Sequence, residues 1–214
     1  LFTFNLKKHA SNELMGLAMN ASVRIVGTKF EEYGPVLFTH WGMSGPGILK
    51  LSAKAAKYLF ERSYQFDYEV EWISNAQDLV DGLRKTNSKM QLSNTKIEGF
   101  PSRFWIYLLQ KGNMDSKKRW ADLNKKELEK LVQLLSRDDY SANGKTTFKE
   151  EFVTAGGINL KEVNMKTMES KIISKLYFSG EVLNIDGYTG GFNFQAAWTG
   201  GFIVADGISK QLAI

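Results

Sequence analysis

The sequence predicts an α+β multidomain fold, and three observations lead to this prediction. In the first 72 residues apolar and polar side chains alternate in several short runs, the period typical of β-strands. Between residues 73 and 138 leucines recur at helical spacing. Nine of the 19 glycines lie in the last 69 residues, so this tail must turn tightly or approach other groups closely at many points.

The β-rich first part contains four predicted strands and one helix. The strands span residues 2–6, 22–26, 36–39 and 65–73. A turn at residues 42–46 opens the helix, and Pro46 fits its first turn because a missing N–H costs nothing there. The apolar stripe of this helix consists of Ile48, Leu51, Ala55 and Leu59.

A helical segment follows. Leu79 and Leu83 mark a first helix, and residues 101–109 read as a second. Asn124, followed three residues later by Glu127, resembles a capping box that starts a third helix.

Residues 140–152 return to strand, with a tight hairpin turn predicted at Asn143-Gly144. The predicted domain plan follows from these elements. It consists of a β-rich segment 1–72, a helical subdomain 73–138, a returning strand 139–152 and a C-terminal segment 153–214.

Composition excludes several classes of protein. The chain has no cysteine, so disulfide scaffolds, thiolate zinc sites, iron–sulfur clusters and cysteine nucleophiles are excluded. With only two histidines, His9 and His40, no metal site built from several histidines is expected. No apolar run reaches 18 residues, which predicts a cytoplasmic protein without a membrane partner. Because the chain starts at Leu1 within a predicted strand, we expect it to be a piece of a longer protein.

Charge is spread too evenly to predict a nucleic-acid partner. The segments 1–60, 61–145 and 146–214 carry net charges of +4, +2 and −1. The basic cluster at residues 117–119 and 125–126 is interleaved with acidic residues, which is typical of a solvated face. The alternative is that this part of the chain binds RNA or a partner protein through that cluster.

The tail carries the features with chemical meaning. Residues 176–179 read as a short buried strand that ends at Gly180-Glu181, where a carboxylate could accept a hydrogen bond from a ribose-like hydroxyl. Gly190-Gly191 opens a predicted helix over residues 192–209, whose first N–H groups would attract negative charge. Asn193 would fix this entry or bind a ligand directly; the alternative is a turn that only connects elements.

Three further groups of residues carry predictions. Gly200-Gly201 inside the last helix predicts that another backbone packs closely there. His40 is the weak candidate for a catalytic acid or base, and the alternative is a structural residue that bonds to a turn. The tryptophans expected to serve packing are Trp41, Trp105 and Trp120.

Five blocks of sequence carry a family resemblance. They span residues 37–49, 154–157, 167–171, 176–181 and 186–195. Together, in this order, they resemble the aminoacetone-oxidase-like (BaiN/YhiN-type) FAD-dependent oxidoreductases. The resemblance implies a Rossmann-like FAD-binding domain interrupted by an insertion, which combines a small β-barrel with a helical subdomain. Residues 153–214 would then be the C-terminal segment of the FAD-binding domain.

The resemblance also implies site residues. Gly180 and Glu181 match the pair expected at the ribityl side of the flavin. The positions expected beneath the pyrimidine edge of the isoalloxazine are Gly190, Gly191, Phe192 and Asn193. Two positions depart from the family pattern: Asn184 stands where aspartate is usual, and Phe192 where tyrosine is usual.

The activity implied is hydride transfer between flavin and a small-molecule substrate or NAD(P)H. A dinucleotide-binding strand–turn–helix would carry G-x-G-x-x-G, which this sequence lacks. We therefore expect the N-terminal half of the FAD-binding domain to be the missing partner. The chain alone is expected to be inactive and to bind FAD weakly or not at all.

Overall fold

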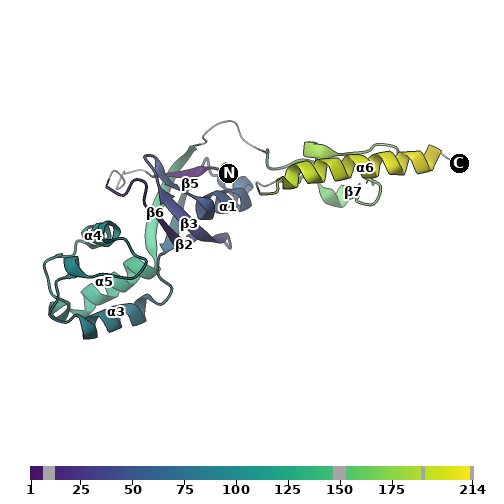
Figure 1. Cartoon of the computed structure of the whole chain (residues 1–214). Coiled ribbons are helices and arrows are strands. Elements are labelled where there is room, and N and C mark those ends of the chain that lie inside the picture. The colour runs from purple at the N-terminus through teal and green to yellow at the C-terminus, as the bar shows by residue number, and fades with distance from the viewer. Residues whose placement is uncertain (7–12, 147–152, 189–190, 213–214) are drawn as a thin grey trace. The chain divides into compact units, whose positions relative to one another are not determined.

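The computed structural model describes residues 1–6, 13–146, 153–188 and 191–212 (Figure 1). It divides the chain into two compact units. The barrel unit contains Phe2–Ala55 and Leu59–Thr146, and the C-terminal unit contains the tail together with Leu1 and Ala56–Tyr58. In the described ranges no helix combines the length and the apolar character needed to cross a membrane.

Six antiparallel strands close the barrel in the order β1-β4-β3-β2-β5-β6. They are β1 (Thr3–Leu6), β2 (Ala18–Ile25), β3 (Glu31–Phe38), β4 (Gly42–Ser44), β5 (Gln65–Glu71) and β6 (Asp138–Thr146). Alternate residues of each strand point inward; on β2 these are Met19, Ala21, Val23 and Ile25, all buried. The predicted α+β class and the barrel are confirmed.

The helix predicted after the glycine-rich turn is present, but it ends before the last two residues of the predicted apolar stripe. α1 (Pro46–Lys54) begins with Pro46 as predicted, and a second short helix, α2 (Ala56–Phe60), follows after Ala55. The whole stripe is nevertheless buried, at 1% exposure or less: Ile48, Leu51, Ala55 and Leu59.

Glycines let the turn between β4 and α1 lie close against the backbone of β3. Gly45 has φ +91°, and a Cβ there would lie 2.6 Å from the carbonyl oxygen of Pro35. Gly47 and Gly34 face each other so closely that a Cβ on Gly34 would lie 3.3 Å from the Gly47 backbone. This β4–α1 turn is therefore held by backbone packing that no other residue type permits.

The helical subdomain joins the barrel between β5 and β6. It contains α3 (Ala76–Thr86), α4 (Ser102–Lys111), α5 (Lys125–Ser136) and two 3₁₀ turns, Leu92–Asn94 and Trp120–Asp122. The predicted capping box is present, with Asn124 Oδ1 accepting from Glu127 N at 3.0 Å and Glu127 Oε2 accepting from Asn124 N at 2.8 Å. Trp105 and Trp120 are buried and stack with centroids 6.3 Å apart, as their packing role predicted.

A buried carboxylate joins the subdomain to the barrel. Asp138, 1% exposed, accepts hydrogen bonds from Trp72 Nε1 at 3.0 Å, Tyr140 Oη at 2.5 Å and Lys111 Nζ at 2.6 Å. Burial raises the pKa of Asp138 and lowers the pKa of Lys111, while their mutual attraction opposes both shifts.

The hairpin turn predicted at Asn143-Gly144 is wrong. Both residues lie inside β6, which continues to Thr146. The strand pairs with β5 on one side, where Gln65 faces Asn143, and with β1 on the other, where the register shifts between Phe4 and Leu6. Gly144, with φ +94°, lies where the register shifts. The Asn-Gly pair therefore stands at a distortion within a strand and not at a turn. Residues 147–152 of the predicted strand lie outside the described residues.

One long helix organises the C-terminal unit. α6 (Phe192–Leu212) runs beside a layer of short elements (Figure 1). These elements are two 3₁₀ turns, Leu160–Glu162 and Gly180–Val182, and a two-stranded sheet of β7 (Val163–Asn164) and β8 (Glu169–Ser170). The small core is made of Val163, Met168 and Leu183 with partly buried neighbours such as Ile203 and Val204.

The buried strand predicted over residues 176–179 is not formed. Leu176 is 37% exposed, and the segment makes one isolated bridge, between Tyr177 and Glu169. Among the described residues its backbone bonds to one neighbouring segment, through Ser170 N to Leu176 O and Phe178 N to Met168 O, whereas its bonds to α6 come from the side chains of Tyr177 and Ser179. A segment with a single short neighbour lacks the ladder that defines a strand.

Candidate functional site

The turn before α6 is held by one asparagine side chain. Asn193 Oδ1 accepts from Gly187 N at 2.8 Å, and Asn193 Nδ2 donates to Gly187 O at 3.0 Å. A Cβ on Gly187 would lie 3.2 Å from Cβ of Phe192, so this position is tightly filled. Of the two roles predicted for Asn193, fixing the entry to the helix is the one that its contacts show. Its amide is occupied by the turn.

The backbone at this turn is open to an approaching group. Gly191 has φ +89°, and a Cβ placed on it would meet nothing within 4 Å. The first helical bond at this end runs from Gln195 N to Gly191 O, so the N–H groups of residues 192–194 precede the helical ladder. Phe192 is 64% exposed. Gly190 of the predicted set lies outside the described residues.

Gly180 and Glu181 lie on a separate turn of the same unit. They begin the 3₁₀ turn Gly180–Val182, where Gly180 has φ +80° and open space around its missing side chain. The Glu181 carboxylate is exposed. This carboxylate therefore follows an extended segment, as predicted, although that segment is not a buried strand.

The α6 surface differs from the prediction made for Gly200-Gly201. A Cβ on Gly200 would lie 3.0 Å from Ser179 Oγ and 3.4 Å from Met168 Cε. The close neighbours at this point are therefore side chains, not another backbone. Elsewhere the helix has a large exposed aromatic ridge, composed of Phe194, Trp198 and Phe202 at 69%, 71% and 74% exposure. An apolar surface of this kind marks a contact site.

His40 and Trp41 lie at the tip of the loop between β3 and β4. His40 is exposed, and Trp41 is 51% exposed, so the packing role predicted for Trp41 is wrong. Thr39 holds the loop, since its Oγ1 accepts from Trp41 N at 3.3 Å and from Gly42 N at 3.2 Å. The tip thus presents two ring side chains on a rigid base. In the part of the chain that the structure describes, no acidic and histidine side chains cluster as a metal site would require.

The basic cluster is arranged as the charge pattern indicated. Lys118 pairs with Glu127 at 2.8 Å and the exposed Lys125 lies 3.8 Å from Glu129. Segment 116–121 runs beside residues 88–93, joined by bonds such as Leu92 N to Lys118 O. A β-bridge places Gln91 opposite Arg119, and both Lys89 and Arg119 are exposed on these paired segments.

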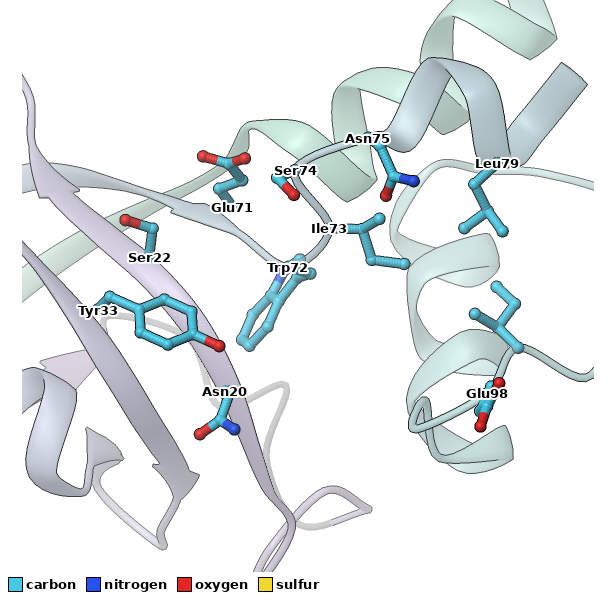
Figure 2. A pocket seen from close by; sticks show the side chains of 11 residues that line it. Asn20, Ser22, Tyr33, Glu71, Trp72, Ile73, Ser74, Asn75, Leu79 and Glu98 are labelled. Atoms are coloured by element: carbon cyan, nitrogen blue, oxygen red, sulfur yellow. The ribbon is translucent and has the colours of Figure 1, made fainter.

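Sequence reasoning missed a cleft between the barrel and the helical subdomain, shown in Figure 2. It has a volume of about 550 Å³. The lining residues are Asn20, Ser22, Tyr33, Glu71, Trp72, Ile73, Ser74, Asn75, Leu79, Ile97 and Glu98. They come from β2, β3, the end of β5, the start of α3 and the loop before α4. Because these segments are far apart in the sequence, no local motif predicts the cleft. The one visible signal was Tyr33, an aromatic residue at an outward position of a strand.

A barrel joined to this helical subdomain defines a known class of domain. Residues 1–153 match the family model described as HI0933-like protein barrel and H2TH domain. The chain therefore belongs to the HI0933-like family, and this membership confirms the resemblance stated for the sequence blocks.

Three curated proteins are similar over nearly the whole chain. Ribosomal RNA dihydrouridine synthase of Haemophilus influenzae is 28% identical over 98% of this chain and 51% of that protein. Ribosomal RNA dihydrouridine synthase of Escherichia coli is 31% identical over 96% and 50%. The 3-dehydro-bile acid delta(4,6)-reductase of Clostridium scindens is 25% identical over 99% and 53%. The chain thus spans about half the length of the curated relatives it matches.

Proposed function

We propose that this chain is part of an FAD-dependent oxidoreductase, with flavin-binding residues in the C-terminal unit and substrate-binding residues in the barrel unit. The observation that carries the proposal is the open turn before α6, found in a chain that belongs to this family. A relative named as a reductase supports the same class of reaction. When bound, FAD would exchange a hydride with the substrate or with NAD(P)H.

The residues of the turn fit the edge of a flavin that becomes negative on reduction. The N–H groups of residues 192–194 lie at the positive end of a 21-residue helix, which favours negative charge. Gly191 has no side chain to obstruct a ring above these groups. Asn193 would act as a positioning residue, because both ends of its amide hold Gly187.

Gly180 and Glu181 would bind the ribityl side. An exposed carboxylate accepts hydrogen bonds from hydroxyl groups, and the open glycine before it permits close approach. The aromatic ridge of α6 would be covered by the part of the parent protein that this chain lacks, which we expect to include the dinucleotide-binding half.

Flavin content tests this proposal. The natural full-length protein should be purified, and its visible absorption spectrum should show bound oxidised flavin. Asn193→Ala should lower the retained flavin, because the turn would lose both bonds to Gly187. Ser209→Ala, near the other end of α6, is the matched control and should retain it. A full-length protein that neither contains flavin nor takes up added FAD would refute the proposal.

The 214-residue chain provides a second measurement. It should take up little or no FAD, because no G-x-G-x-x-G turn is present to hold the pyrophosphate. Stoichiometric, tightly held flavin on this chain alone would contradict the assignment of the pyrophosphate site to the missing half.

RNA binding by the barrel unit is the second candidate function. It is supported by the exposed Lys89 and Arg119 on the two hydrogen-bonded segments 88–93 and 116–121, and by two relatives whose names specify ribosomal RNA. RNA would then be the substrate class, in place of a small molecule. Binding of single-stranded RNA should weaken as salt rises, and Arg119→Glu with Lys117→Glu should reduce that salt dependence. Binding that is unchanged by this charge reversal would refute the role of this surface.

A further inference from the structure

The cleft between the barrel and the helical subdomain has polar groups that the fold does not use. Within the described ranges, the side chains of Asn20, Asn75 and Glu98 make no hydrogen bond or ion pair, and Asn75 does not cap α3 although it stands at the N-cap position. Figure 2 shows Asn20 on the barrel side of the cleft and Glu98 on the opposite side. Exposed polar side chains without a protein partner stand on two walls of one cleft and are available to a ligand.

Tyr33 provides an aromatic wall. It projects from the outer face of β3, opposite Ser22 in the register of β2 and β3, and is 67% exposed. In the part of the chain that the structure describes, no other aromatic ring lies against it. An exposed ring beside a cleft is the usual platform on which a planar heterocycle stacks.

The charge of the cleft restricts what can bind there. Its charged residues are Glu71 and Glu98, and none of its lining residues is basic. Two carboxylates repel phosphate and accept hydrogen bonds only. The ligand edge in the cleft must therefore carry N–H donors, and any phosphate attached to the ligand must remain outside.

We propose that this cleft binds an unpaired guanine base. Guanine is the RNA base whose Watson–Crick edge has two adjacent N–H donors, N1–H and N2–H₂, and one carboxylate can accept both. Uracil has a single N–H between two carbonyl oxygens, which a carboxylate would repel. The amides of Asn20 and Asn75 can both donate and accept, so they can bind the remaining edge.

The size of the cleft agrees with this ligand. Sites for small ligands measure about 300–1,000 Å³, and the cleft, at about 550 Å³, lies in this range. It can therefore contain a base with its ribose. The source of the base is inferred to be single-stranded RNA, a step that rests on the second candidate function above. Recognition of guanine itself rests only on the cleft.

Titration calorimetry of the 214-residue chain with free nucleosides tests base recognition. Guanosine should bind about tenfold or more tightly than inosine, which lacks the N2 amino group, and uridine should bind more weakly still. At least one of Glu71→Gln and Glu98→Gln should abolish the preference for guanosine over inosine. Equal binding of guanosine and uridine, or no binding of guanosine, would overturn the proposal.

Variants of Tyr33 distinguish a loss of ring stacking from a loss of the folded structure as the cause of weaker binding. Tyr33→Ala should weaken guanosine binding about tenfold, whereas Tyr33→Phe, which keeps the ring, should bind as the unaltered chain does. Phe60→Ala is the matched control, since Phe60 is 70% exposed and lies outside the cleft. If Tyr33→Ala binds guanosine normally, the stacking wall is wrong and the proposal fails.

The source of the base is tested by two further ligands. Guanosine triphosphate should bind no more tightly than guanosine, because the carboxylates disfavour its phosphates. A uridine heptamer with one central guanine should bind more tightly than guanosine and than the all-uridine heptamer. Tightest binding by the triphosphate would overturn the assignment to RNA. None of these measurements involves flavin, so their failure is distinct from failure of the oxidoreductase proposal.

Discussion

At the scale of single residues, Asp138 is the most demanding position in the barrel unit. Its buried carboxylate accepts three side-chain hydrogen bonds, and its donors come from β5's end, β6 and α4. Tyr68 nearby has a buried hydroxyl without a partner in the described residues, so this region has little tolerance for a further unsatisfied group. Desolvation raises the pKa of the Tyr107 hydroxyl to about 12 in the same cluster.

Asp138→Ala should reduce the free energy of unfolding by about 3–5 kcal/mol, because Lys111 and two donors would lose their acceptor in a buried place. Asp138→Asn keeps an acceptor and should lose less. Asp139→Asn is the control, since the Asp139 side chain is 59% exposed. Urea unfolding followed by circular dichroism measures all three. A loss with Asp138→Ala no larger than with Asp139→Asn would show that the network does not stabilise the fold.

Gly45 gives a second residue-scale prediction. Gly45→Ala would place a Cβ 2.6 Å from the Pro35 carbonyl oxygen, so β3 and the turn between β4 and α1 would have to separate. Gly27→Ala has a similar positive φ, +72°, but open space, and should cost only about 1 kcal/mol of backbone strain. Gly45→Ala should therefore lower the melting temperature clearly more than Gly27→Ala. Equal effects would mean that backbone strain alone explains both.

At the scale of elements, the capping box of α5 couples helix stability to pH. Hydrogen bonds from Lys118 and from the Asn124 backbone lower the pKa of Glu127. The folded state therefore favours the ionised carboxylate, and this contribution is present above the ordinary glutamate pKa, about 4.3. It is lost as the pH falls through the lowered pKa, because the unfolded chain then binds more protons.

Asn124→Ala should cost about 1 kcal/mol near neutral pH, since one helix N–H loses its acceptor. Glu127→Gln keeps a capping group but loses the charge. Urea midpoints should be measured from pH 7 to pH 3. The midpoint of the unaltered chain should be higher than that of Glu127→Gln at neutral pH, and the difference should disappear in acid. A gap that is constant over this range would contradict the lowered pKa.

Elements with strong local signals were predictable from sequence. The capping box at Asn124 and Glu127 and the inward alternation of β2 depend on neighbours in the chain, and both are present. The predictions at Asn143-Gly144 and at residues 176–179 failed because strand pairing depends on partners far along the chain. The cleft was missed for the same reason, because Tyr33, Glu71 and Glu98 come together only in the folded barrel unit.

At the scale of the whole molecule, the C-terminal unit has too little core for its apolar surface. In the described part of this unit the buried cluster has three residues, whereas the aromatic ridge of α6 is largely exposed. Phe194 and Trp198 are one helical turn apart, with ring centroids 6.2 Å apart, so the ridge is continuous there. A surface of this kind favours association with another apolar surface.

The 214-residue chain should therefore self-associate through this ridge. Trp198→Glu combined with Phe202→Glu should lower the sedimentation coefficient toward that of a monomer, because charged groups would replace the exposed rings. Gln195→Glu, on the same exposed helix, adds a charge without removing an aromatic ring and serves as the control. A sedimentation profile unchanged by the double substitution would show that the ridge does not drive association.

The closure of the barrel has a consequence for synthesis. Thr3 on the first strand pairs with Thr146 on the last, so the ring of strands is incomplete until residue 146 has left the ribosome. The helical subdomain between them is made of local contacts. It can therefore fold before β6, the second neighbour of β1, has been made. During that interval β1 presents a bare hydrogen-bonding edge. The last step in folding this unit is then the docking of a finished helical subdomain and β6 onto a strand that was made earlier.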